Sequence, residues 1–409
     1  MTEANIYEQI LDYSNRADPY PLYAELRKTP VARQEDGTYV VSGYREIVAL
    51  LHDPRVSSDP RNIPEIAAAD AAAEETPELP ASFIRHDPPD HDRLRAMVMR
   101  HFGPPRSPGR VDGMTPRIME IITGLIDNFA GKSRVDIVDD FAYPMPVTVI
   151  CELLGVPRED EPLFHRWSQA IIETADPTTG SIVERDRRST QIRAELAEYL
   201  NGLVDVHRQQ PGDDLISALV TDPGIDMSRG DLLTTAVTLL VAGHETTVNL
   251  ITNGVLTLLR HPDVLERLRH EPDLIIGTVE ELLRYEPPVQ LISLRRSALA
   301  DIDIAGTTIP KGSVISLALA AGNRDAARFR DPDRFDPDRE DNQHLGFGSG
   351  IHYCFGAPLA RLETQLALRE IARRLVNPRL VSDPPPYRPN PGLRGPRHLA
   401  VEFDDIIPA

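Results

Sequence analysis

One glycine-rich run governs how this sequence is interpreted: Phe347-Gly348-Ser349-Gly350-Ile351-His352-Tyr353-Cys354-Phe355-Gly356. It holds one of only two cysteines and precedes a helical pattern that begins near Leu359. Backbone N–H groups of such a loop and of the first helical turn can point at the sulfur, which would lower the pKa of the thiol. A soft, anionic sulfur on one open face suits iron. The run therefore predicts a metal-ligating thiolate; the alternative is an inert cysteine packed in a turn.

A long helical pattern lies upstream, from Ser228 to about Arg260. Ser228 and Asp231 resemble a capping box, and some 30 residues give a helix roughly 45 Å long. Apolar positions cover more than one face, which predicts a buried central helix. Its middle reads Ala242-Gly243-His244-Glu245-Thr246-Thr247, a poor choice for a buried helix. Such exceptions favour a functional site, and the alternative is a kink whose charged side chains face solvent.

Two other clusters of charge stand on helical patterns. Glu281 and Arg284 are three residues apart and can form an ion pair on one face. An ordinary surface pair would contribute little to stability. His91 and Arg95, after the turn Asp87-Pro88-Pro89, are four apart and share a face as well. These positions indicate a binding site only if their side chains converge on a common ligand.

Composition narrows the class of protein. The 409 residues carry a net charge of −19, which argues against binding to nucleic acid or to an anionic membrane. Two cysteines make no disulfide framework, and Cys151 in an apolar stretch is expected to serve packing. The N-terminus lacks a signal-peptide pattern, and no segment approaches about 20 apolar residues. We expect a cytoplasmic protein with no membrane segment.

Helical patterns dominate, and strands are few. A hairpin is expected around Glu35-Asp36-Gly37, with further strands at 301–304, 314–317 and 398–403. The fold class predicted is mainly α with a minor β subdomain. One domain, 1–409, is expected, with β-rich parts at about 28–60, 290–322 and 379–405 and helical parts at about 86–288 and 356–377. Residues 58–84 predict a long, mobile loop.

The motifs together resemble the cytochrome P-450 family, in the form of the soluble bacterial haem-thiolate monooxygenases. Phe347, Gly348, Gly350, Cys354 and Gly356 match the family's haem-binding loop. The resemblance runs from the Asp87 region to the C-terminus, with the motifs in the correct order. It implies a triangular helical body with haem between the long central helix and the helix that follows the cysteine.

The resemblance also implies roles for individual residues. Cys354 is the axial iron ligand of a heme b, and dioxygen is a co-substrate. Thr246 hydrogen-bonds the oxygen being activated, Glu245 relays protons, and Gly243 leaves room for the distal ligand. The positions that match haem-contacting residues of the family are Phe347, Gly348, Gly356, Ala242, His91, Arg95, His352 and Arg296. The last four match propionate partners, and Arg295 remains an alternative to Arg296.

Three residues match a structural set. Glu281, Arg284 and a third member, Arg339, are expected to lock the core on the haem side. Two departures from the family's usual pattern stand near the haem loop and the propionate motif. Phe355 replaces a common leucine, which would alter packing against the sulfur, and Asp92 replaces a common threonine, which adds negative charge.

The implied partners are a ferredoxin or flavodoxin with an NAD(P)H-dependent reductase, because 409 residues leave no evident flavin or nicotinamide domain. Docking is expected on the cysteine side, where Arg93, Arg100, Arg361 and Arg369 would form a positive patch. The protein is expected to be a monomer.

The implied substrate is a small apolar organic molecule, by analogy a secondary metabolite: a polyketide, macrolide, terpene or steroid. Its pocket is expected to be lined by residues 60–86 and by Thr238, Val241, Ala242, Val289, Leu291, Ile292 and Leu393. Two alternatives stay open. One is a haem-thiolate enzyme that uses peroxide or performs oxidative coupling or ring closure, and the other is a non-catalytic haem sensor.

Overall fold

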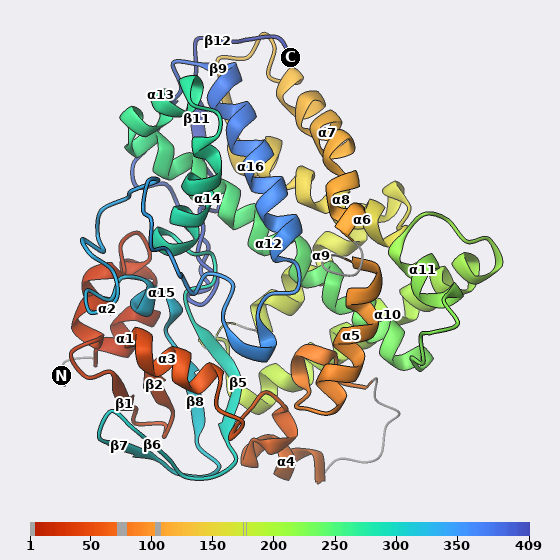
Figure 1. The fold of residues 1–409 in the computed structure, drawn as a ribbon, viewed down its shortest axis with the longest axis vertical. Coiled ribbons are helices and arrows are strands. Elements are labelled where there is room, and N and C mark those ends of the chain that lie inside the picture. Colours follow the sequence, from red (N-terminus) through yellow and green to blue (C-terminus); the bar gives the residue numbers. More distant parts are fainter. Residues whose placement is uncertain (1–4, 72–79, 103–107, 175, 177) are drawn as a thin grey trace.

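The structure is a computed structural model that describes residues 5–71, 80–102, 108–174, 176 and 178–409 (Figure 1). Helices form most of it. In chain order they are α1 (Ile6–Leu11), α2 (Tyr20–Leu26), α3 (Tyr44–Leu51), α4 (Pro64–Ala71), α5 (Asp90–Phe102), α6 (Pro108–Gly113), α7 (Thr115–Asp127), α8 (Pro144–Leu154), α9 (Glu161–Thr174), α10 (Ile182–Gln209), α11 (Leu215–Thr221), α12 (Arg229–Arg260), α13 (Pro262–His270), α14 (Leu274–Tyr285), α15 (Leu319–Asn323) and α16 (Ala357–Arg374).

The strands are short. They are β1 (Val31–Arg33), β2 (Tyr39–Val41), β3 (Val56–Ser57), β4 (Arg134–Asp136), β5 (Ile292–Ala298), β6 (Ile302–Ile304), β7 (Thr307–Ile309), β8 (Val314–Leu317), β9 (Leu375–Val376), β10 (Arg379–Leu380), β11 (Ala400–Glu402) and β12 (Asp405–Ile406). The fold class predicted from the sequence, mainly α with a minor β part, is confirmed. The predicted hairpin is β1 and β2, which pair antiparallel.

The largest sheet has the order β1-β2-β8-β5-β3 and joins distant parts of the chain. Only the β2–β8 pair in it is parallel. This sheet lies at one side of the helical body, together with the N-terminal helices (Figure 1). A second sheet, β10-β11-β4, brings β4 from the helical part of the chain to the C-terminal strands. The sequence patterns did not predict β4.

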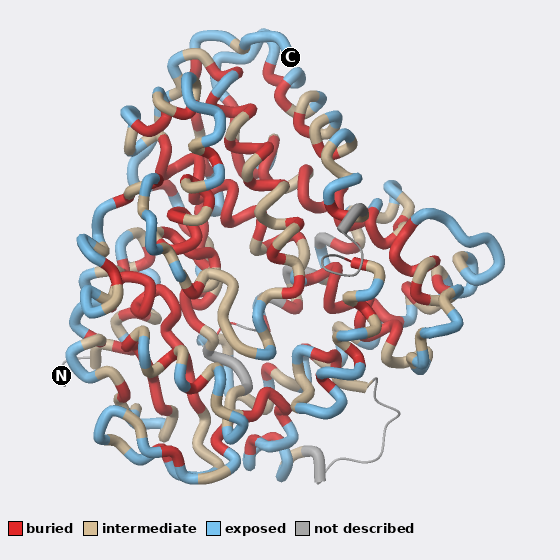
Figure 2. Tube along the Cα trace, in the orientation of Figure 1, coloured by how far each residue is buried: buried red, intermediate tan, exposed pale blue. Residues whose placement is uncertain are grey.

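The long helix α12 passes through the centre of the helical body. Its first turn carries the predicted capping box, because Ser228 Oγ accepts from the N–H of Asp231 while the Asp231 carboxylate accepts from the N–H of Ser228. Helices α8, α10, α14 and α16 contact it. Most residues of α12 are buried (Figure 2). Buried apolar side chains therefore occur on more than one of its faces, as predicted.

The prediction of a long loop at 58–84 is wrong where the structure describes it. The segment contains α4 and two short 3₁₀ turns, Pro60–Asn62 and Phe83–Arg85. Alanine-rich sequence after Pro64 favours a helix, with proline at its first position. Residues 72–79 lie outside the described residues.

Cys151 is buried in α8, as the packing role predicts, and burial raises the pKa of its thiol to about 12. Among the helices of the described residues, none combines the length and the apolar character that crossing a membrane requires.

Candidate functional site

The cysteine loop is a turn held by its own backbone. The N–H of Cys354 donates to the carbonyl of Phe347 at 2.9 Å, and α16 begins three residues after the cysteine. Gly350 has a φ of 70°, and a Cβ there would lie 2.2 Å from the carbonyl oxygen of Leu51, so only glycine fits. The loop therefore presents the sulfur of Cys354 at the start of a long helix.

The pKa of Cys354 differs from the prediction. Burial raises the pKa of its thiol; the N–H groups of Gly356 and Ala357 and the charges of Arg95 and Arg361 oppose this only in part. The backbone groups act in the predicted direction, but the prediction of a net lowering is wrong. Desolvation of a charge outweighs a few N–H dipoles in a site this dry.

Phe355 lies beside the cysteine in an aromatic cluster. Its ring centroid is 4.3 Å from that of Phe102 and 5.8 Å from that of Phe83. The residue flagged as a departure from the family's pattern therefore links the loop to α5 and to the segment before it.

Two imidazoles meet next to the cysteine loop. The rings of His91 and His352 are 4.4 Å apart between centroids. His91 Nδ1 lies 2.8 Å from Asp92 Oδ1, and His352 Nε2 lies 2.9 Å from Ser58 Oγ. The other ring nitrogen of each histidine is buried without a hydrogen-bond partner. The extra carboxylate of Asp92 thus orients His91 rather than opposing it.

Two arginines, Arg95 and Arg296, lie near these imidazoles. Arg95 donates to the carbonyl of Tyr353 at 2.7 Å, and burial lowers its pKa. Burial also lowers the pKa of Arg296, to about 10. Burial and then the charges of Arg296, His91 and Arg95 lower the pKa of His352 to about 3. The four sequence-predicted partners therefore lie together, and the nearby positive charges disfavour the protonated form of His352, an effect that an anionic group between them would offset. The side chain of Arg295 lies outside the described part.

Accessible positions interrupt the buried middle of α12. Ala242 is exposed and Thr246 partly so, within a helix whose neighbouring turns are buried. Thr246 Oγ1 donates to the carbonyl of Ala242 at 3.0 Å. Gly243 is needed for packing as well, because a Cβ there would lie 2.9 Å from Ile150 Cδ1 of α8. The two accessible side chains mark an open space beside the helix centre.

Glu245 has a partner that the sequence did not indicate. It is only 2% exposed, and its Oε1 lies 2.5 Å from Arg388 Nη1. Its Oε2 is buried without a hydrogen-bond partner, 3.9 Å from His244 Nε2. The alternative that the charged pair faces solvent is therefore wrong. Arg388 stands far along the chain, so no local pattern could link it to Glu245.

Only some of the residues predicted to contact the substrate lie close to one another. Val289 and Leu393 form an isolated β-bridge and so lie together. Thr238 is buried with its hydroxyl unpartnered, next to the largely buried Val241. Leu291 contradicts the prediction, because it packs in a cluster with Tyr7, Ile10 and Tyr23 of the N-terminal helices. Side chains alternate along an extended chain, so Leu291 points away from the face of its neighbours, Ile292 included.

A cavity of about 310 Å³ lies at the N-terminal half of α12. Described residues of the predicted segment 60–86 line it, together with Asp59 and residues of α10. Its lining residues are Asp59, Pro60, Arg61, Ile66, Pro80, Ala81, Ser82, Arg85, His86, Asp186, Thr190, Arg193, Thr234 and Val237. The lining includes charged side chains, and its α10 residues were not predicted.

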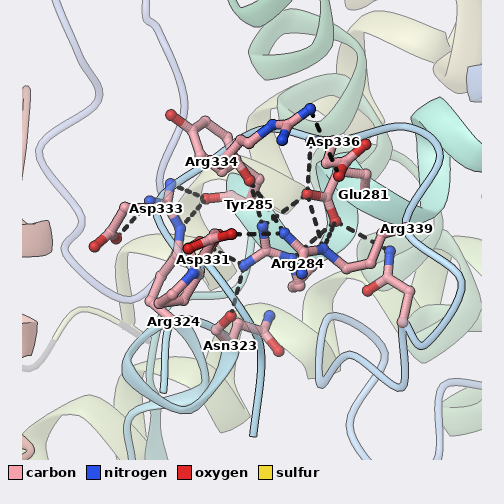
Figure 3. A network of polar contacts seen from close by, with 12 residues as sticks. Glu281, Arg284, Tyr285, Asn323, Arg324, Asp331, Asp333, Arg334, Asp336 and Arg339 are labelled. Atoms are coloured by element: carbon pink, nitrogen blue, oxygen red, sulfur yellow. Dashed lines mark hydrogen bonds and ion pairs between the residues drawn. The ribbon is translucent and has the colours of Figure 1, made fainter. Parts of the chain in front are cut away.

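Glu281, Arg284 and Arg339 lie together in a buried network (Figure 3). Arg284 Nη2 lies 2.7 Å from Glu281 Oε1, and Arg339 Nε lies 3.2 Å from Glu281 Oε2. Arg284 also donates to backbone carbonyls of Asn323, Pro332 and Arg334. The alternative of an exposed helical pair is wrong, because Glu281 and Arg284 are fully buried. The network ties α14 to the loop that leads to the cysteine.

The donor set fits an iron porphyrin. Unpartnered nitrogens of His91 and His352, with Arg95 and Arg296, suit two carboxylates. Cys354 suits iron, and the accessible Ala242 and Thr246 allow a flat group against α12. The two histidines and two arginines would hold the propionates, and Cys354 would bind the metal. Ala242 and Thr246 would lie against one face of the ring.

Comparison with known proteins agrees with this geometry. Residues 65–394 match the family described as cytochrome P-450. The chain is 42% identical over 402 residues to the cytochrome P-450 monooxygenase PikC of Streptomyces venezuelae, covering 95% of this chain and 91% of PikC. It is 39% identical to the 6-deoxyerythronolide B hydroxylase of Saccharopolyspora erythraea, covering 96% and 97%. The ligand-free structure of CYP164A2 from Mycobacterium smegmatis has a TM-score of 0.88 at 40% identity, covering 97% of this chain and 99% of that one.

Proposed function

The chain belongs to the cytochrome P-450 family, and on that premise we propose that it inserts one oxygen atom from dioxygen into a small organic substrate. It is an oxidoreductase, since its relatives are monooxygenases and hydroxylases. The family implies haem held by a cysteine thiolate. The observation that carries the proposal is the convergence of His91, Arg95, Arg296 and His352 beside Cys354.

We assign the finer roles as follows. The cofactor is heme b, Cys354 is its axial ligand, and the four converging residues hold its propionates. The whole chain, 1–409, acts as one haem-binding domain and as a cytoplasmic monomer. A haem bound there supplies the iron at which dioxygen is activated. Phe347, Gly348, Gly356 and Ala242 contact the ring. Thr246 positions the oxygen from the accessible face of α12, and Glu245 delivers protons to it.

The pair Glu245–Arg388 defines how that proton delivery works. Because its Oε1 is held by Arg388, Glu245 is fixed in place. Its Oε2, buried and without a partner, is the atom free to accept and pass on a proton. Arg388 is therefore proposed as a positioning residue for the relay.

The substrate class follows by analogy. One relative is named a 6-deoxyerythronolide B hydroxylase and another a mycinamicin IV hydroxylase/epoxidase. We propose a secondary metabolite of that kind, contacted by Thr238, Val241, Ala242, Val289, Ile292 and Leu393. A test is turnover with surrogate ferredoxin, reductase and isotopically labelled dioxygen. Incorporation of label into product supports the proposal, and a product without it favours coupling or ring closure instead.

We predict that Thr246→Ala uncouples electron consumption from product formation. Without the hydroxyl, protons and oxygen are no longer aligned, so product per NADH oxidised falls by about a hundredfold. Thr247→Ala is the matched control, because Thr247 is buried and donates to the carbonyl of Gly243. Equal coupling in the two variants, measured as product per NADH, would contradict the role of Thr246.

The docking surface for the electron donor needs revision. Each of the four predicted arginines has an acidic neighbour: Arg93–Asp90, Arg100–Asp222, Arg361–Glu280 and Arg369–Glu370. Arg361 is bound tightest, with Nε 2.6 Å from Glu280 Oε1. Beside the cysteine, Ile351 and Tyr353 are 47% and 39% exposed. We propose that ferredoxin contacts these apolar side chains, with Arg93 and Arg369 as the steering charges.

We predict that Arg369→Glu raises the KM for reduced ferredoxin several-fold, with the effect shrinking as salt rises. Reversal at Lys28, an exposed residue paired with Glu25 just after α2, is the control and leaves the KM unchanged. The measurement is the rate of electron transfer from reduced ferredoxin, followed by stopped flow at several ionic strengths. Insensitivity to both salt and Arg369→Glu would contradict electrostatic docking at this face.

A further inference from the structure

The cavity between α10, the N-terminal half of α12 and the described residues 59–66 and 80–86 contains buried donors without acceptors. They are Ser82 Oγ, Arg85 Nε and Arg193 Nη1, and all three residues line the same space. A buried donor that finds no acceptor is costly, so proteins rarely leave several together. Three in one cavity indicate that a ligand supplies the oxygen atoms.

The charges that line this cavity do not balance. Arg61 binds Asp59 through two nitrogens, and Arg85 Nη2 lies 2.8 Å from Asp186 Oδ1. Arg193 donates from Nε to Ser189 Oγ at 3.2 Å. Burial and the charge of Arg85 lower the pKa of Arg193 to about 10, and the attraction of Asp186 does not restore it. Among the described lining residues, one cation is therefore in excess.

The excess of a single charge selects the kind of anion. A carboxylate carries one negative charge and accepts two parallel hydrogen bonds from a guanidinium. A phosphate monoester carries between one and two charges, more than this lining balances. The carboxylate is the better match to one excess arginine with two further donors.

The position of the cavity sets the length of the ligand. Thr234 and Val237 of α12 line it, and Thr246 follows Val237 by nine residues on the same helix. At 1.5 Å per residue the distance along the helix is about 14 Å. Between them lie Val241 and the accessible Ala242, which suit an apolar body. A ligand that spans this distance has one charged end and one end near Thr246.

We propose that the substrate is an amphiphile with one carboxylate, which Arg193 binds together with Arg85 and Ser82 beside the N-terminal half of α12, while its other end lies near Thr246. This proposal rests on the haem function above. It specifies a charged end group that the apolar contacts alone would not require.

The test compares dodecanoate with 1-dodecanol, two probes that differ only in the end group. Calorimetry measures the affinity of the purified full chain for each probe, and this measurement does not depend on the haem content. The shift of the Soret band reports whether each probe reaches the haem. We expect dodecanoate to bind at least tenfold more tightly than the alcohol. Arg193→Gln should weaken the acid ten- to a hundredfold and leave the alcohol nearly unchanged, because one charge-assisted contact is lost.

Arg188→Gln is the matched control, since Arg188 is exposed on the same helix, α10, and does not line the cavity. It should leave both affinities unchanged. Arg85→Gln serves as a second variant if Arg193→Gln does not fold. Equal binding of acid and alcohol, no binding of dodecanoate, or equal weakening of both by Arg193→Gln would overturn the carboxylate proposal. Failure of the haem function would appear separately, as the absence of a haem spectrum in the same sample.

Discussion

Replacing Cys354 by serine is expected to abolish the long-wavelength absorption band that the reduced carbon monoxide complex of a haem thiolate shows. That band arises from the soft, anionic sulfur bound to iron, and a hydroxyl supplies neither property. The measurement is a difference spectrum of the reduced protein with and without carbon monoxide. We also expect hydroxylation to fall below detection, because the electron density that the sulfur gives to iron is lost.

Cys151→Ala is the matched control for this substitution. Cys151 is the only other cysteine in the sequence and is buried in α8, where the raised pKa keeps it a thiol. Its variant should retain the band at full intensity and lose only a small amount of stability from the missing sulfur. If Cys354→Ser kept the band, or if Cys151→Ala lost it with haem still bound, the ligand assignment would be wrong.

The environment of Cys354 explains why the metal is part of the site. Burial raises the pKa of the thiol despite the N–H groups that face it. A bound metal cation inverts this preference, because a coordinating thiol loses its proton outright. In the proposed ligation, the protein would orient the sulfur, and a bound iron would provide the charge that keeps it deprotonated.

Local patterns predicted those features that depend on neighbouring residues. The capping box at Ser228, the hairpin after Val31 and the helix after Cys354 all depend on interactions within a few positions. The helix α4 was not predicted because the segment around it is rich in proline and weakly patterned, although its alanines favour a helix.

Long-range partners could not be predicted in the same way. Arg388 reaches Glu245 from a C-terminal segment, and nothing near either residue indicates the other. Arg193 is one of several arginines on α10, and only the packing of that helix against the cavity distinguishes it. The orientation of Leu291 and Ile292 could not be predicted from local patterns either. The register of the chain decides which of these two neighbours faces the site.

The second large effect is expected at Arg284. Its guanidinium is fully buried and donates to both oxygens of Glu281 and to three backbone carbonyls (Figure 3). Removing it by Arg284→Ala leaves the Glu281 carboxylate buried with one cation fewer, which costs about 3–5 kcal/mol of folding free energy. Arg284→Lys is expected to lose most of this too, because an ammonium has three donors and no planar fork.

Arg334 provides the control for that experiment, because the same network uses its backbone carbonyl while its side chain is 70% exposed. Arg334→Ala should change stability by no more than about 0.5 kcal/mol. Urea unfolding followed by circular dichroism, with haem content measured in parallel, separates the two variants. Because the network lies between α14 and the loop that leads to Cys354, Arg284→Ala should lose haem at urea concentrations where Arg334→Ala still holds it. Similar midpoints for both variants would mean that the buried ion pair does not hold this side of the site together.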